Sequence, residues 1–329
     1  MRRILVLATN LAQASFRLRI AALEPLLKQH GFELEVFLRP RGMFASPKLR
    51  AKLRDSARYH AVLIQRKFLS PGEAKLLRRH AGRIVYDIDD ALMHHNRTVG
   101  WISRWRARRN FEATAGILDH VVAGNEYLAA MFRARRREVS IIPTMLDSQR
   151  YLIKPHEPTA APRLVWIGSR STLQYLRDFL PALEEAARQM PGLRLLTIAD
   201  ATVESRLLQI EHVEWTEAGE AEALCRGDIG IAPTPSDPWT MGKCGFKILQ
   251  YMASGLPVVA SPVGANAELV QEDVTGYLPR QKADWPSAIL KLARNAELRA
   301  RMGAAARDLA ATQYTLGRAA DDWTRILDS

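Results

Sequence analysis

The sequence predicts an α/β protein built from two doubly wound, Rossmann-like domains with parallel sheets. Its 329 residues are enough for two separate hydrophobic cores. Short apolar runs rich in β-branched residues alternate with helical stretches in both halves, which is typical of parallel sheets covered on both faces. Between the halves, residues 151–162 contain three prolines and show no hydrophobic period.

We expect six strands in each half of the chain. The first half contributes RILVLAT, LEVFLR, AVLIQR, RIVYDID, HVVAG and SIIPT, and the second contributes RLVWIG, RLLTIAD, VEWT, DIGIAPT, PVVAS and TGYL. The expected divisions are an N-terminal domain over residues 1–152, a linker over 153–162 and a C-terminal domain over 163–310. A last helix within residues 311–329 is expected to pack back on the N-terminal domain.

Composition and charge narrow the class of protein. With 47% hydrophobic and 25% charged residues, the chain is typical of globular proteins. It lacks an apolar run of about 18 residues, and MRRILVLATN suits a first strand better than a signal peptide. The only cysteines are Cys225 and Cys244, which suits a reducing cytoplasm. A net charge of +12 predicts acidic or phosphorylated partners.

The segment KCGFKILQYMASGLPVVASPVG, residues 243–264, is the most informative part of the chain. A loop with two lysines leads into a short helix that ends at Gly255, and an apolar strand follows. This order puts Lys243 and Lys247 at a helix N-terminus, where N–H groups and the helix dipole favour an anion. We therefore expect a phosphate or diphosphate at this helix.

A second loop, GSRST at Gly168–Thr172, follows the predicted strand RLVWI. In open α/β sheets the ligand lies beyond the carboxyl ends of the strands. The loop offers backbone N–H groups, hydroxyls and Arg170 to phosphate oxygens. Alternatively it is an ordinary turn that caps the following helix. Because it shares a sheet edge with KCGFK, we interpret it as part of a diphosphate site.

These motifs resemble the retaining GT-B glycosyltransferases of family four, most strongly over residues 227–278. The resemblance implies two domains facing each other across a cleft, with a nucleotide-sugar donor on the second and an acceptor on the first. A family glutamate that bonds the ribose matches Gln250, and a second one matches Gly242. Arg170 resembles the family's arginine on the diphosphate, and Lys243 or Lys247 resembles its lysine.

The resemblance and the two loops give one set of donor-side candidates. The expected donor-binding residues are Gly168, Ser169, Arg170, Ser171, Thr172, Thr234, Lys243, Cys244, Gly245, Phe246, Lys247 and Gln250. The expected catalytic residues are Asp89, Arg170 and Lys247.

The sequence IVYDIDD places Asp87, Asp89 and Asp90 at the end of a predicted strand. Such carboxylates hold magnesium or manganese in metal-dependent GT-A enzymes, which is one interpretation. By the GT-B resemblance this strand end faces the cleft, and Asp89 lies near a histidine position beside the transferred sugar. We favour the second interpretation and expect no metal and no cofactor. The acceptor-side candidates are Arg17, Arg19, Asp87 and Asp90.

The segment GWISRWRARRNFEA, residues 100–113, is both basic and aromatic. Trp101 and Trp105 are four residues apart and so share one helix face. Such a helix suits an anionic membrane surface, with arginines on lipid phosphates. Alternatively the tryptophans belong to the core and the arginines to water.

The sequence thus predicts a retaining, metal-independent glycosyltransferase of the hexosyltransferase type. Its partners would be a nucleotide-diphosphate sugar and a glycan or lipid-linked acceptor, as in polysaccharide biosynthesis. We expect a cytoplasmic enzyme that is peripheral on the inner membrane face. The alternatives are a GT-B-like nucleotide-sugar epimerase and a basic nucleic-acid-binding protein. Nucleic acid is not expected, because the sequence contains no RNA-binding motif.

Overall fold

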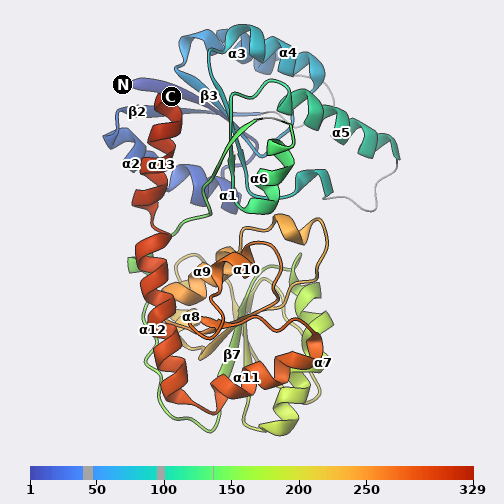
Figure 1. The fold of residues 1–329 in the computed structure, drawn as a ribbon, viewed down its shortest axis with the longest axis vertical. Coiled ribbons are helices and arrows are strands. Elements are labelled where there is room, and N and C mark those ends of the chain that lie inside the picture. The colour runs from blue at the N-terminus through green and yellow to red at the C-terminus, as the bar shows by residue number, and fades with distance from the viewer. Residues whose placement is uncertain (40–46, 95–100, 136) are drawn as a thin grey trace. The chain divides into compact units, whose positions relative to one another are not determined.

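The computed structural model describes residues 1–39, 47–94, 101–135 and 137–329 of the chain. These residues form two compact units, which Figure 1 shows as separate α/β bodies. Unit 1 comprises Met1–Met145, Met241–Cys244 and Leu316–Ser329, and unit 2 comprises Leu146–Thr240 and Gly245–Thr315. Each unit has its own six-stranded sheet, in which every strand pair is parallel. The predicted fold of two doubly wound α/β domains is confirmed.

The sheet of unit 1 has the strand order β2-β1-β3-β4-β5-β6. Its central strands are buried on both faces, which explains their continuous apolar runs. The order reverses between β1 and β3, so loops that follow these two strands meet at one edge of the sheet. The strands are β1 (Arg2–Ala8), β2 (Phe32–Leu38), β3 (Ala61–Gln65), β4 (Ile84–Ile88), β5 (His120–Ala123) and β6 (Glu138–Ile141).

Helices cover the sheet of unit 1, and the last helix of the chain, α13, is one of them. Phe68, Tyr86, Phe111 and Phe132 form a continuous aromatic cluster in the core of this unit. The helices are α1 (Ala14–Phe16), α2 (Glu24–Gln29), α3 (Pro47–Arg54), α4 (Pro71–His80), α5 (Trp101–Ala115), α6 (Glu126–Arg133) and α13 (Leu316–Asp328), with a π-helical turn at Arg17–Ala21 and 3₁₀ turns at Asp55–Arg58 and Leu92–His94.

The sheet of unit 2 has the order β12-β11-β10-β7-β8-β9, which is the Rossmann order read from one edge. The order reverses between β7 and β10, and this switch point is where such sheets bind nucleotides. The strands are β7 (Arg163–Ile167), β8 (Arg194–Ala199), β9 (Gln209–Glu214), β10 (Ile229–Ala232), β11 (Val258–Ala260) and β12 (Gly276–Tyr277). All strands predicted from the sequence are present in both sheets.

Two apolar layers, one on each side, fill unit 2. Trp166 and Trp285 lie in one layer and Tyr251 lies in the other. The helices are α7 (Leu173–Gln189), α8 (Glu220–Cys225), α9 (Phe246–Ala253), α10 (Ala265–Leu269), α11 (Trp285–Ala293) and α12 (Ala296–Gln313), with 3₁₀ turns at Ser148–Arg150 and Lys282–Asp284. A further 3₁₀ turn, Thr240–Gly242, begins in unit 2 and ends in unit 1.

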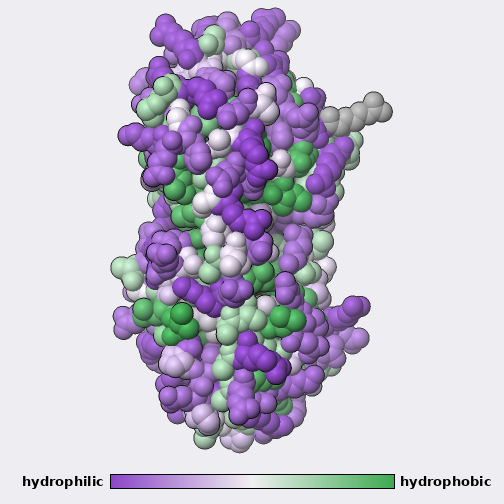
Figure 2. Space-filling model, turned by 60° about the vertical axis from the view of Figure 1, so that its left-hand side comes forward, coloured by the Kyte–Doolittle hydropathy of each residue, from purple (hydrophilic) through white to green (hydrophobic). Residues whose placement is uncertain are grey.

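Hydrophilic residues predominate on the face drawn in Figure 2, where hydrophobic residues form small separate patches. This agrees with a chain of which 25% is charged. None of the helices in the described part of the chain combines the length and the apolar character that crossing a bilayer requires.

Candidate functional site

The switch point of unit 2 is held together by one tyrosine. The ladder between β7 and β10 involves only Leu164–Val165 on β7. Beyond it, the hydroxyl of Tyr251 accepts from the Ile167 N–H and donates to the Ile231 carbonyl, both at 3.0 Å. A side chain on Gly230 would lie 2.4 Å from the Tyr251 ring, so only glycine fits there. Tyr251 therefore fixes the two strand ends from which the site loops leave.

Helix α9 starts at this edge with its first turn uncapped by a side chain. Its N-cap is Gly245, which has a left-handed φ of 64°. The first N–H groups of a helix have no partner within the helix, and the dipole favours an anion there. The Nζ of Lys247 lies 4.7 Å from the centre of the Trp166 ring. This cation–π contact holds a positive charge beside the first turn of α9.

The loop Gly168–Thr172 is organised mainly by its own hydrogen bonds. A Cβ on Gly168 would lie 2.4 Å from the Trp166 ring, so close packing explains this glycine. The Thr172 hydroxyl accepts from the Ser169 N–H at 3.2 Å, and the hydroxyls of Ser169 and Ser171 are 2.8 Å apart. These are the contacts of an ordinary turn that leads into a helix. The two serine hydroxyls remain at the exposed surface.

Arg170 extends from the same loop into solvent, with 76% of its side chain exposed. Its backbone N–H donates to Asp200 Oδ1 at 2.6 Å, and its side chain donates to the Asp200 carbonyl at 3.2 Å. Asp200 follows β8, so the loops after β7 and β8 are joined by this contact. The backbone N–H of Arg170 is therefore already engaged, while its guanidinium is accessible to a ligand.

Thr234 belongs to a polar cluster at the carboxyl ends of β10 and β11. Its N–H donates to the Ser261 hydroxyl at 2.9 Å, and Asn266 Nδ2 lies 3.3 Å from its Oγ1. Asn266 Nδ2 also donates to the Ser261 carbonyl at 3.2 Å. Our sequence analysis did not predict Ser261 or Asn266. Their positions could have indicated them, because Ser261 directly follows the apolar run VVA and Asn266 comes five residues later.

Gln250 is not placed as we expected for a ribose ligand. It is only 5% exposed, and it lowers the pKa of the neighbouring Tyr151. Tyr151 donates in turn to Glu220 at 2.8 Å, and the Trp215 indole donates to the other oxygen of Glu220 at 2.9 Å. Burial, together with Glu220, raises the pKa of Tyr151. Gln250 lies on the predicted helix, α9, but its side chain is buried inside unit 2.

Two residues that we assigned to the donor belong to unit 1. The Nζ of Lys243 lies 2.9 Å from Asp90 Oδ1, and the Cys244 thiol donates to the Asp89 carbonyl at 3.1 Å. Burial raises the pKa of the Cys244 thiol well above its usual value. Both residues therefore have partners in unit 1, and their assignment to donor phosphates stays a prediction. The predicted KCGFK motif is divided, because unit 2 resumes only at Gly245.

Gly242 shows why the second glutamate of the resemblance is absent. A Cβ at this position would lie 2.5 Å from the Cβ and 2.6 Å from the backbone nitrogen of Ala91. Ala91 directly follows Asp90, and both belong to unit 1 with Gly242. No side chain fits this contact, so a carboxylate there would displace the segment.

Arg19 and Asp87 form a buried ion pair in unit 1, not an acceptor-facing pair as we expected. Their side chains are 2% and 0% exposed. Arg19 donates to both carboxylate oxygens of Asp87, with a shortest distance of 2.6 Å, and also to the Ile142 carbonyl at 2.8 Å. Buried charges need such pairing, because desolvation is costly. The neighbouring Arg17 is half-buried in the same helical turn.

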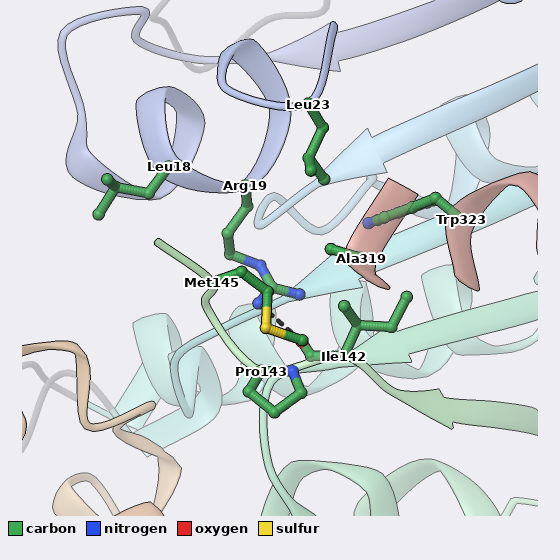
Figure 3. Close-up of a pocket in the computed structure, with 8 residues that line it drawn as sticks. All are labelled: Leu18, Arg19, Leu23, Ile142, Pro143, Met145, Ala319 and Trp323. Carbon is green, nitrogen blue, oxygen red and sulfur yellow. Dashed lines mark hydrogen bonds between the residues drawn. The ribbon is translucent and has the colours of Figure 1, made fainter. Parts of the chain in front are cut away.

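Figure 3 shows the guanidinium of Arg19 among apolar side chains, with a dashed hydrogen bond to Ile142. A cavity of about 10 Å³ lies beside it, which is room for about one water molecule. Its lining comes from three separate parts of unit 1: Leu18, Arg19, Leu23, Ile142, Pro143, Met145, Ala319 and Trp323. The pair is thus part of the core, and its role is to hold β4.

Asp89 and Asp90 lie at the carboxyl end of β4, beside an arginine that the sequence analysis missed. Arg66 follows β3; its Nη2 lies 2.6 Å from Asp90 Oδ2, and its Nε lies 3.4 Å from Asp89 Oδ1. Its φ of 57° is left-handed, and such strain in a residue other than glycine is concentrated at functional sites. Burial opposes the charge of Arg66, yet Asp89 and Asp90 raise its pKa.

Asp89 is the least neutralised carboxylate of this cluster. Burial raises the pKa of Asp89 although Arg66 opposes the shift, and Asp90 adds to it. Its Oδ1 is buried and has no hydrogen-bond partner among the residues that the structure describes. A buried acceptor of this kind favours a ligand hydroxyl as its partner. Groups of three or more residues suited to hold a metal ion are absent from the described ranges.

Helix α5 exposes both of its tryptophans. Trp101 is 74% and Trp105 is 55% exposed, and Ile102 beside them is also exposed. The Arg109 guanidinium lies 4.7 Å from the centre of the Trp105 ring. Burial begins only at Phe111, where the helix joins the core. The alternative that the tryptophans belong to the core is wrong; Gly100, the first residue of the predicted segment, lies outside the described residues.

The sequence of unit 2 matches a known family. Residues 161–295 match the family described as glycosyl transferases group 1, and this range includes β7–β12 and α7–α11. Over this range unit 2 is similar to the group 1 glycosyltransferases. The predicted resemblance and the prediction of a glycosyltransferase are both confirmed. The switch point with Tyr251, Lys247 and the loop Gly168–Thr172 lies inside the matched glycosyltransferase segment.

Individual relatives agree with this assignment. D-inositol 3-phosphate glycosyltransferase of Nocardia farcinica is 24% identical over 84% of this chain and 76% of its own length. Sulfoquinovosyl transferase SQD2 of Arabidopsis thaliana is 32% identical over 43% of this chain and 28% of its own length. Both are glycosyltransferases by name.

Solved structures share the fold over the whole chain. HepE of Anabaena, in complex with UDP and glucose, gives a TM-score of 0.73 at 15% identity and covers 100% of both chains. Sucrose-phosphate synthase of Thermosynechococcus elongatus gives 0.72 at 14% identity and covers 100% of this chain and 98% of its own. At these identities the glycosyltransferase likeness concerns the fold alone.

Proposed function

We propose that the protein is a retaining glycosyltransferase that moves a sugar from a nucleotide-diphosphate sugar to an acceptor hydroxyl. The observation that carries the proposal is the switch point of unit 2 within the group 1 glycosyltransferase segment. There the Trp166 ring contacts both Lys247, at the uncapped start of α9, and the backbone of Gly168. A diphosphate that spans these two elements would meet the charge of Lys247 and the positive end of the α9 dipole.

The chemistry of transfer explains why these groups are useful. When the sugar leaves, negative charge develops on the diphosphate, and preorganised donors that stabilise this charge lower the barrier. Lys247 and the first turn of α9 supply a charge and a dipole. Arg170 and the hydroxyls of Ser169 and Ser171 lie on the loop that contacts the same Trp166 ring. We assign the diphosphate to these residues.

UDP-sugars are the first donors to test. The relatives support this choice, since HepE was solved with UDP and glucose, and TarM with UDP and α-GlcNAc-glycerol. The proposed base is therefore uracil, and the proposed sugars are glucose and N-acetylglucosamine.

Unit 1 would bind the acceptor near Asp89. The support is its buried Oδ1, which has no hydrogen bond among the described residues, together with the left-handed backbone of Arg66. A lipid-linked acceptor of polysaccharide synthesis fits this unit, because α5 exposes tryptophans next to four arginines. We propose that α5 lies on an anionic membrane surface at the cytoplasmic face, with its rings among the headgroups.

The proposed reaction needs no metal. The support is the use of Asp87, the first carboxylate of the D-x-D sequence, which is fully bonded to buried Arg19 and so offers no oxygen to an ion. Activity with a UDP-sugar should therefore persist in EDTA. Complete loss that magnesium or manganese restores would contradict this part of the proposal.

Ligand-dependent thermal shifts test the proposal as a whole. A ligand that binds only the folded protein raises Tm with concentration, so UDP, GDP and ADP with their glucose and N-acetylglucosamine conjugates should be compared. We expect a shift with at least one diphosphate and, with an acceptor, a product of retained anomeric configuration by NMR. Absence of any shift would overturn the donor site. An epimerised donor without acceptor would favour the epimerase.

A further inference from the structure

Asn125 is a fully buried polar residue that the proposed chemistry does not use. It follows β5 after Gly124 and is 0% exposed. Its Oδ1 caps α6 by accepting from the Leu128 N–H at 2.9 Å. Its Nδ2 donates to the carbonyls of Met241 and Lys243, at 3.0 Å each. One amide therefore uses its acceptor on its own helix and both of its hydrogens on a distant segment.

That segment, Met241–Cys244, fits tightly against the strand ends of unit 1. A Cβ on Gly124 would lie 2.2 Å from the Cys244 sulfur, and a Cβ on Gly242 would lie 2.5 Å from the Ala91 Cβ. Lys243 adds its ion pair with Asp90 at 2.9 Å. The two glycines allow the close approach, and Asn125 fixes the backbone through two carbonyls.

The segment is also the chain directly before the proposed donor site. Cys244 is followed by Gly245, whose left-handed φ of 64° starts α9, and Lys247 lies in the first turn. Because α9 is covalently continuous with the fixed segment, the backbone path into its first turn depends on where Cys244 is held. If Met241–Cys244 became less ordered, the N-terminus of α9 would also be less well ordered, and donor binding would then cost more conformational entropy.

We propose that Asn125 is a positioning residue for donor binding: its amide holds Met241–Cys244 and thereby orients the first turn of α9 toward the diphosphate. This inference rests on the proposed function. Asn125 does not touch the donor itself. It acts through the backbone of the segment that precedes the helix with Lys247, so its removal weakens donor binding without removing a donor contact.

Asn125→Asp separates this role from helix capping. Aspartate has the same size and is an equally good N-cap, so the bond from the Leu128 N–H is kept. Its carboxylate cannot donate and would face two carbonyl oxygens instead. We expect about tenfold weaker UDP binding by calorimetry and a matching rise of the donor KM, since two neutral hydrogen bonds are lost.

Amide hydrogen exchange without any ligand supplies a second readout. In Asn125→Asp, peptides covering residues 241–248 should exchange faster, while peptides of α6 should exchange as in the wild type. Asn295→Asp is the matched control, since Asn295 caps α12 by accepting from the Leu298 N–H at 2.9 Å and lies exposed in unit 2. This control should leave UDP affinity and exchange at residues 241–248 unchanged.

A second variant keeps the test valid if Asn125→Asp does not fold. Gly242→Ala disturbs the same segment from the other side, by the contact with Ala91, and leaves Asn125 intact. It should weaken UDP binding in the same direction. Wild-type UDP affinity in either folded variant would overturn the inference and leave the proposed function standing. A wild-type protein that binds no nucleoside diphosphate would overturn the proposed function and this inference with it.

Discussion

The guanidinium of Arg19 donates three hydrogen bonds to the carboxylate of Asp87, in a pair whose side chains are 2% and 0% exposed. The pair connects the helical turn after β1 with the end of β4, the strand that carries Asp89 and Asp90. It therefore supports the strand end that carries Asp89 and Asp90, and its own side chains are closed to solvent.

Asp87→Asn should destabilise the protein strongly. Breaking a buried pair leaves an uncompensated charge on Arg19, which costs about 3–5 kcal/mol. The free energy of unfolding in urea measures this cost. A double replacement of Arg19 by Met and Asp87 by Leu should recover much of the loss, because it removes both charges. A single variant as stable as the wild type would mean that the pair is not buried in solution.

Lys247→Ala should weaken binding of UDP by about 1.5–3 kcal/mol, the range for a charged hydrogen bond. Arg170→Ala should act in the same direction, and calorimetry measures both. Lys291→Ala is the matched control, because Lys291 also covers an aromatic ring, that of Tyr277 at 5.1 Å, but lies on α11. Unchanged affinity in both Lys247→Ala and Arg170→Ala would remove the diphosphate from this edge.

Tyr251→Phe should lower the free energy of unfolding by about 1–3 kcal/mol, because the Ile167 N–H and the Ile231 carbonyl lose their buried partner. Tyr86→Phe serves as the control, since the Tyr86 hydroxyl is buried without a hydrogen-bond partner in the described part of the chain. That replacement should be neutral or slightly stabilising. Equal effects of the two variants would contradict the bridging role of Tyr251.

Asp89→Asn should stabilise the protein near neutral pH while it lowers activity. Because burial raises the folded-state pKa of Asp89, its contribution to stability is present below its unfolded pKa of about 4. That contribution is lost as pH rises through the raised pKa. Asparagine removes this dependence, so the gain over the wild type should be larger at pH 7 than at pH 4. Urea unfolding at both values measures it, and a less stable variant at pH 7 would refute the shift.

Anionic but not neutral lipid vesicles should bind the protein through α5. Each arginine near an anionic surface contributes about 1 kcal/mol, and salt screens this contribution. Vesicle sedimentation should show weaker binding when the four arginines of the exposed turns are replaced by glutamine, namely Arg104, Arg106, Arg108 and Arg109.

The matched control for this experiment changes the same total charge in unit 2, at the exposed residues Arg188, Arg206, Arg294 and Arg301. If net charge alone attracted the vesicles, both quadruple variants would lose binding equally. Equal binding of the wild type to neutral vesicles, or none to either kind, would assign α5 to ordinary solvated surface.

The sequence by itself determined the two sheets and the helix that starts near Lys247. Strands such as AVLIQ and RLVWI are continuous apolar runs, and a glycine follows the last turn of α9, so local patterning was sufficient. The loop Gly168–Thr172 could also be predicted from local pattern, because it directly follows the apolar run RLVWI. The resemblance then supplied the family, which the match over residues 161–295 supports.

Only the tertiary structure decided which polar groups are already used. Lys243 and Lys247 are four residues apart, yet one pairs with Asp90 in unit 1 and the other lies over Trp166 in unit 2. For Asn125 the sequence could indicate only a helix cap. Its two other partners, the carbonyls of Met241 and Lys243, lie more than a hundred positions away in the chain. Periodicity reports burial along the chain, whereas the pairing of donors, acceptors and charges depends on which distant segments the fold brings within about 3 Å.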